Sequence, residues 1–336
     1  MSRRFVLIML LTGVVLGGLF VLHIATGTVR LAPADVLAAL RDQATDPVYR
    51  QIVWNLRLPR ALVAVAAGAM LGLAGALLQA LTRNPLAEPG LTGVSAGAVL
   101  LAVLWLTNQQ RWTNSLLLPA VALVGGMGAG LLVYGLSWNG RVEPLRLALI
   151  GVLVSAVLQS GTSLLLIRSP EALGGVLLWI IGSLNGRVWV HWNMIWPWAA
   201  VALPLGLACA GLANVLQLDD DIGRGLGLRI EWARALLLLV AALLTAGAVA
   251  VVGAIGFIGL IGPHIARRLI GDDARRVFLL SALLTAAILL GADVVAQGLT
   301  ITPPFPTTTA RAGLPVGAVT ALLGAPFFLY LARKSR

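Results

Sequence analysis

The chain has 336 residues, of which 59% are hydrophobic and only 11% are charged. An ordinary soluble domain has roughly 45–50% apolar and about 25% charged residues, so the composition excludes a soluble globular protein and indicates a polytopic membrane protein. The net charge of +11 is then a property of membrane orientation, and no nucleic-acid binding is expected. Cys209 is the single cysteine, which excludes a disulfide framework.

Long uncharged runs predict the membrane spans, because a helix needs about 20 apolar residues to cross the hydrocarbon core. They cover residues 5–29, 61–82, 89–110, 112–140, 147–167, 188–218, 235–266 and 312–332, and 277–310 with only Asp293 inside. The run 235–266 would extend about 48 Å as one helix. Two spans are therefore expected there, with a turn among the glycines from Gly253 to Gly262 and at Pro263. The sequence predicts an all-α fold of about ten spans in one transmembrane domain, residues 1–336.

The 24 cationic residues test this count. With ten spans, fifteen of them fall on the side that holds both termini and nine on the other side. The positive-inside rule makes the richer side cytoplasmic. The first apolar run, residues 5–28, exceeds the roughly 7–15 residues of a signal-peptide core, so we expect a retained first span. Residues 31–51 and 168–187 are expected on the outer face, the second as a short half-helix.

Catalytic chemistry has little support in the sequence. His23, His191 and His264 have no second His or Cys at ligand spacing, so we expect interfacial or packing roles, no metal site and no cofactor. A phosphate-binding loop needs a lysine, and the only lysine is Lys334, so ATP hydrolysis would belong to a separate chain. Asp293 lies inside an apolar run and is predicted to be functional or paired. A membrane enzyme or an ion-coupled secondary transporter remains the alternative from another class.

Three stretches resemble the permease subunits of type II ABC importers for iron-siderophore complexes, cobalamin and haem. They are Arg57-Leu-Pro-Arg60 through Gly90, Gly253 through Ile265 with two arginines after it, and Leu314 through Phe328. The resemblance implies a permease of the bacterial cytoplasmic (inner) membrane, with both termini cytoplasmic, for a ferric siderophore or a similar metal chelate. Cobalamin and haem are the alternative cargoes. The implied partners are a second permease subunit, identical or paralogous, two ATP-binding cassette subunits, a periplasmic or lipid-anchored substrate-binding protein, and membrane lipid.

The resemblance also implies roles for residues on the outer face. Arg57 and Arg60 match arginines that receive acidic residues of the binding protein in the family, and two outward cations are therefore expected. A third family arginine is replaced by Gln297, four residues after Asp293. Arg311, in an outer loop insertion over residues 299–313, is expected to take over its charge.

On the cytoplasmic side, the resemblance implies a gate and a coupling segment. The gate residues are Asn84 and Leu86 after the second span and Pro144 and Leu145 before the fifth, with simple tight turns as the alternative. Residues 218–234 are expected to form two short helices that contact the ATPase. Within this segment the coupling residues are Asp220, Arg224, Leu226 and Gly227.

Overall fold

The computed structural model describes residues 3–27, 29, 31–41, 46–108, 117–139, 143–168, 173–218, 220–301 and 312–334. Almost all of the regular structure in these ranges is helical. The helices are α1 (Arg3–Ala25), α2 (Pro33–Leu40), α3 (Pro47–Gln51), α4 (Leu58–Thr82), α5 (Val94–Asn108), α6 (Leu118–Ser137), α7 (Pro144–Arg168), α8 (Leu173–Ile181), α9 (Trp189–Ala208), α10 (Ala210–Leu216), α11 (Asp220–Gly225), α12 (Ile230–Val252), α13 (Ile258–Ile270), α14 (Ala274–Gly298) and α15 (Val316–Lys334). Two short strands, β1 (Thr300–Ile301) and β2 (Ala312–Gly313), pair antiparallel.

The helices fall where the uncharged runs predict spans. Six of them are long and apolar enough to cross a membrane: α1, α4 with the turns before it, α6, α7, α12 and α14. The count rises to seven if the pair α9 and α10, bent by 43°, is one span. The shorter helices α5, α13 and α15 occupy the three remaining predicted positions. The predicted half-helix in the outer segment 168–187 is present as α8.

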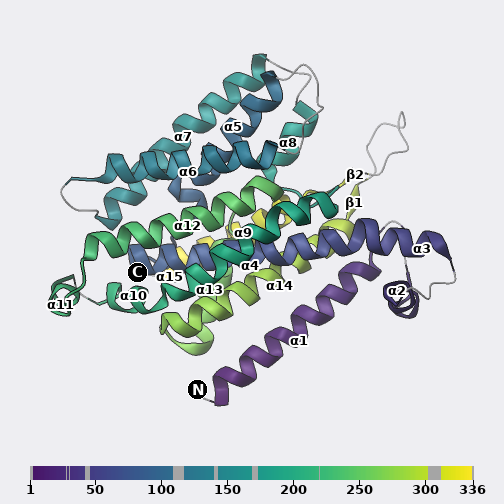
Figure 1. Ribbon diagram of the computed structural model, residues 1–336, viewed down its shortest axis with the longest axis horizontal. Coiled ribbons are helices and arrows are strands. Elements are labelled where there is room, and N and C mark those ends of the chain that lie inside the picture. Colours follow the sequence, from purple (N-terminus) through teal and green to yellow (C-terminus); the bar gives the residue numbers. More distant parts are fainter. Residues whose placement is uncertain are drawn as a thin grey trace.

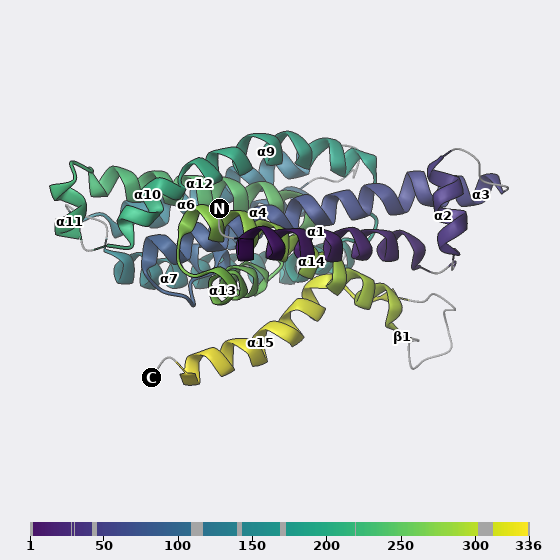
Figure 2. The same ribbon diagram turned by 90° about the horizontal axis from the view of Figure 1, so that it is seen from below.

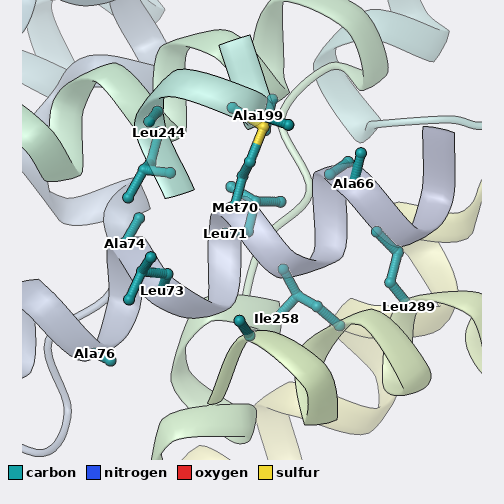
Figure 3. Close-up of a cluster of buried hydrophobic side chains, with 14 of the residues drawn as sticks. Ala66, Met70, Leu71, Leu73, Ala74, Ala76, Ala199, Leu244, Ile258 and Leu289 are labelled. Carbon is teal, nitrogen blue, oxygen red and sulfur yellow. The ribbon is translucent and has the colours of Figure 1, made fainter. Parts of the chain in front are cut away.

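Helix α4 is the centre of the bundle, with α9, α12, α13 and α14 packed around it (Figure 1). Its side chains are buried almost without interruption from Ala61 to Leu81. Figure 3 shows Met70 and Leu71 of α4 among side chains of the surrounding helices. Small residues permit this packing: a methyl group on Gly75 would collide with the backbone carbonyl of Gly259 in α13. Close backbone contact of this kind is how helices associate in a membrane.

A π-helical turn, Ile52–Arg57, joins α3 to α4. Pro59 follows it in the first turn of α4. A proline cannot donate a backbone hydrogen bond, and its ring clashes with the carbonyl group four residues earlier. A wider π turn relieves this conflict, and such turns recur at functional positions.

The long run 235–266 divides as the sequence predicted. Helix α12 ends at Gly253, which has a φ of 77°, and α13 begins at Ile258. Pro263, expected in the turn, lies inside α13 instead. Two backbone hydrogen bonds hold this break to the end of α8: Ser183 donates to Val252, and Ala254 donates to Trp179. A third, from Gly317 to Gly182, joins the start of α15 to the same end of α8. The end of α8 and the start of α15 are thereby joined to the α12–α13 break.

The two ends of the bundle carry different elements. Both termini lie toward the end that carries α11, while α2, α3 and the two strands lie at the opposite end (Figures 1 and 2). Helix α15 diverges from the body of the bundle (Figure 2). The coupling segment 218–234 differs from the expected two short helices: α11 is one short helix, a turn over residues 226–229 follows, and residues 230–234 are the first turn of α12. Within the insertion 299–313, residues 302–311 lie outside the described residues.

Candidate functional site

A cluster of polar side chains connects α1, α4, α14 and the link after α8 at the end of the bundle that carries α2 and α3. We call it the outer polar cluster; it consists of His23, Arg60, Asn185, Asp293 and Gln297. Arg60 donates from Nε to Asp293 Oδ2 at 2.8 Å and from Nη2 to Oδ1 at 2.7 Å. A second bond from Arg60 Nη2 reaches Asn185 Oδ1 at 2.8 Å. This bidentate geometry is the strongest form of an arginine–carboxylate pair.

Two further groups complete the coordination of Asp293. His23 Nε2 lies 2.7 Å from Oδ2, and Gln297 Nε2 donates to the same oxygen at 3.1 Å. Both His23 and Asp293 have side chains that are 1% exposed. Gln297 Nε2 also lies 3.0 Å from His23 Nε2, and among the described residues His23 Nδ1 has no hydrogen-bond partner. The cluster neutralises a buried carboxylate and ties three helices together.

Arg57 is directed into the protein and satisfies backbone carbonyl groups. It donates from Nη1 to Ile24 at 2.7 Å and to Ala25 at 3.0 Å, and from Nη2 to Val29. The residue is 7% exposed. Since the last turn of a helix leaves carbonyl groups without intrahelical partners, Arg57 acts as a cap for the end of α1.

The expectation of two free outward cations is therefore wrong for Arg57 and Arg60, whose guanidinium groups are used inside the chain. Their contact with a binding protein stays a prediction without support from this geometry. Asp293 does pair with a cation, but the cation is Arg60 of α4, 233 positions earlier in the sequence. Gln297 contributes a neutral hydrogen-bond donor. Arg311 lies outside the described residues, so its compensating role stays a prediction.

Arg187 is a further cation near this end, in the turn that links α8 to α9. Burial and the nearby charge of Arg60 lower the pKa of its guanidinium to about 10. Its Nη1 lies 3.2 Å from His191 Nε2, and its Nε has no partner among the described residues. The outer end thus holds more positive charge than its one buried carboxylate neutralises.

At the opposite end, the predicted coupling residues divide into an internal and an exposed set. Asp220 accepts from Arg83 Nη2 at 2.6 Å and from Arg234 Nη2 at 2.9 Å, which fixes α11 to the end of α4 and the start of α12. Arg224 pairs with Asp221 and Glu231 at 3.3 Å. Leu226, in contrast, is 67% exposed. Gly227 has a φ of 82°, the left-handed conformation that favours the expected tight bend.

Two cavities lie one after the other along α7. The inner cavity has a volume of about 340 Å³, and residues of the predicted gate, Asn84 and Leu145, both line it. Leu86 donates its backbone N–H to Asn84 Oδ1 at 2.9 Å, and Pro144 begins α7. The outer cavity has a volume of about 630 Å³ and extends along α5 and α7 to the α12–α13 break. Glu88, in the link between α4 and α5, lines both cavities.

The polar lining of the outer cavity was not predicted. Four polar residues of α7 line this cavity: Ser155, Gln159, Thr162 and Ser163. Their spacings of four, three and one residues place them on one side of the helix. This stripe is a sequence signal, because polar residues repeat along one face of an otherwise apolar span. This wall of the cavity therefore presents hydroxyl and amide groups.

The fold is that of a helical membrane protein with two cavities along α7. A metal-chelate type ABC transporter, solved in an inward-facing conformation, has the same fold: the TM-score is 0.82 at 29% identity, covering 96% of this chain and 97% of that one. The chain belongs to the FecCD transport family, whose model matches residues 10–334.

Two named relatives are similar over most of their length. The achromobactin transport system permease protein CbrC of Dickeya dadantii is 36% identical over 94% of this chain and 88% of the relative. The Fe(3+)-citrate import system permease protein YfmD of Bacillus subtilis is 41% identical over 85% of this chain and 82% of the relative. The chain is accordingly a multi-pass membrane permease, and the class of a transport subunit that the sequence predicted is confirmed.

Proposed function

We propose that this chain forms the translocation pathway of an ATP-driven importer for a ferric siderophore or a similar metal chelate. The observation that supports this most directly is the pair of cavities along α7 that meet at Glu88, in a chain of the FecCD family. The relatives named for achromobactin and ferric citrate point to the class of cargo. Cobalamin is an alternative, since a cobalamin import permease of Halobacterium salinarum is 37% identical over 84% of this chain and 73% of the relative; haem is another.

The two ends of the bundle receive different partners in this proposal. ATP hydrolysis belongs to two separate ATP-binding cassette subunits, which dock on α11 and its exposed apolar side chains Ile222 and Leu226. A periplasmic or lipid-anchored substrate-binding protein docks at the end with α2 and α3. The excess of cations on the α11 side supports a cytoplasmic position for that end and for both termini, in a bacterial inner membrane.

A second permease subunit, identical or paralogous, packs along α7 in this proposal. Leu149, Leu153 and Val157 are exposed on α7 at intervals of four residues, which aligns them as an apolar stripe beside the cavities. Such a stripe suits either lipid or another helix. A second copy placed there would close the open side of both cavities and convert them into an enclosed pathway.

Reconstitution tests the proposal. The chain is co-expressed with its ATPase and binding protein, purified and placed in liposomes, and uptake of candidate ferric siderophores is measured with ATP or with a non-hydrolysable analogue. We expect uptake only with ATP and with all subunits present. Uptake that needs an ion gradient and no ATPase would instead identify a secondary transporter.

A further inference from the structure

Glu88 is the only ionisable residue that lines either of the two cavities in the described part of the chain. Glu88 lines both cavities, and its carboxylate also accepts a hydrogen bond from a distant part of the chain. Oε2 accepts a hydrogen bond from the backbone N–H of Phe257 at 2.9 Å, across 169 positions of sequence. The link between α4 and α5 is thereby fastened to the break between α12 and α13.

Phe257 needs such a support because its backbone is in an unfavourable region. It has a φ of 63° and a ψ of −16°, the left-handed conformation, at the residue before α13. A bulky residue adopts this conformation only where its surroundings hold it there. The carbonyl group of Phe257 accepts from Leu260 and Ile261 and so begins α13. The N–H group of the same residue donates to Glu88.

Phe257 also contacts α15. Its ring meets the edge of Phe328 with centroids 6.4 Å apart. A methyl group on Gly324 would collide with the Phe257 side chain, so α15 lies directly against it. Three elements far apart in sequence therefore meet at one strained residue: the link that carries Glu88, the start of α13, and the middle of α15.

We propose that Glu88 is a positioning residue of the gate, whose hydrogen bond to Phe257 makes the α4–α5 link and α15 move as one unit. The proposal rests on the proposed function, in which the two cavities are parts of one pathway. The α4–α5 link also carries Asn84 of the inner cavity. A displacement of α15 would move Phe257 and, through the hydrogen bond to Glu88, the α4–α5 link that lines both cavities.

The test measures the position of α15 directly and needs no cargo. Spin labels are attached to cysteines placed at Leu322 of α15 and Leu279 of α14, both exposed, in a full-length chain in which Cys209 is replaced by alanine. The distance distribution between the labels is recorded in lipid for the chain that retains Glu88 and for the Glu88→Gln and Glu88→Ala variants. A side-chain amide oxygen can still accept the Phe257 N–H, whereas alanine cannot.

We expect Glu88→Ala to shift or broaden the distance distribution and Glu88→Gln to retain it. In the reconstituted complex, uptake should fall about tenfold for Glu88→Ala and about threefold or less for Glu88→Gln, as loss of a bond to a charged group predicts. Glycine adopts the left-handed conformation without strain, so Glu88→Ala should have no further effect on the distances in a Phe257→Gly background. The control Leu329→Ala, at the exposed neighbour of Phe328, should leave them unchanged.

Two outcomes would overturn the positioning role. One is a distance distribution that Glu88→Ala leaves unchanged. The other is loss of uptake in Glu88→Gln with α15 undisturbed, which would mean that the carboxylate acts on the cargo through its charge. Because the distance measurement requires neither ATPase nor chelate, failure of uptake in the unsubstituted complex would count against the proposed function alone.

Discussion

Substitution of Asp293 should show how much the outer polar cluster stabilises the bundle. Asp293→Ala removes the acceptor of two bonds from Arg60, one from His23 and one from Gln297. It also leaves the Arg60 guanidinium, whose side chain is 16% exposed, without a carboxylate. Breaking a buried ion pair from one side costs about 3–5 kcal/mol. Gln297→Ala removes one neutral amide group, which contacts Asp293 at 3.1 Å and His23 at 3.0 Å, and should cost about 1 kcal/mol.

A double-mutant cycle separates this pairing from other effects of the substitutions. The free energy of unfolding is measured in one detergent for Asp293→Ala, Arg60→Met and the double variant. Residues in direct contact should show a coupling energy of about 1–3 kcal/mol, with the double variant less destabilised than the sum of the single ones. Strictly additive losses, or an Asp293→Ala protein within about 0.5 kcal/mol of the unsubstituted chain, would refute the pairing as a source of stability.

Three further substitutions test other parts of the structure. Gly75→Ala should separate α4 from α13 and lower the midpoint of thermal unfolding clearly, whereas Gly128→Ala, with open space around it, should be neutral; equal effects would contradict the close packing. Leu226→Asp should reduce co-purification of the ATPase without a change in unfolding, and full retention would remove α11 as its docking face. The hydrogen bond from the Asn214 side-chain amide to Asp273 Oδ1 lowers the pKa of Asp273, which caps α14. Asn214→Ala should therefore lower the free energy of unfolding at neutral pH. That difference should become smaller as the pH falls below the ordinary value of 3.8 and through the lowered pKa, because protonation of Asp273 then weakens its bond to Asn214 in the unsubstituted protein, while the bond from the Ala274 N–H to Asn214 Oδ1 remains. A difference that does not change with pH would exclude the contribution of Asp273.

The sequence predicted the spans because their cause is local. A long uncharged run must form a helix in lipid, where each backbone polar group needs an internal partner. The same holds for the break at Gly253, whose φ of 77° is accessible to glycine without a side-chain clash. The family resemblance led to the predicted gate residues Asn84 and Leu145, which both line one cavity; their gating role stays a prediction.

The outer polar cluster could not be predicted in the same way. His23 and Asp293 are 270 positions apart, and neither has a neighbour in sequence that identifies the other. The sequence offered two arginines beside an apolar helix, and an outward direction was the simplest interpretation. The π turn before Pro59 and the carbonyl groups at the end of α1 direct Arg57 inward, and both features arise from backbone geometry that single residues do not reveal.

The glycine contacts of α4 limit how this protein can change shape. Gly68 and Gly72 lie against α14, and Gly75 against α13, so closely that a single methyl group does not fit. Helices in such contact cannot slide past one another by small steps, because packed interfaces are not continuously deformable. Helices α4, α13 and α14 are therefore expected to behave as a rigid block during each transport cycle. The opening and closing of the proposed pathway would then fall to elements outside this block, such as α7 with its exposed apolar side.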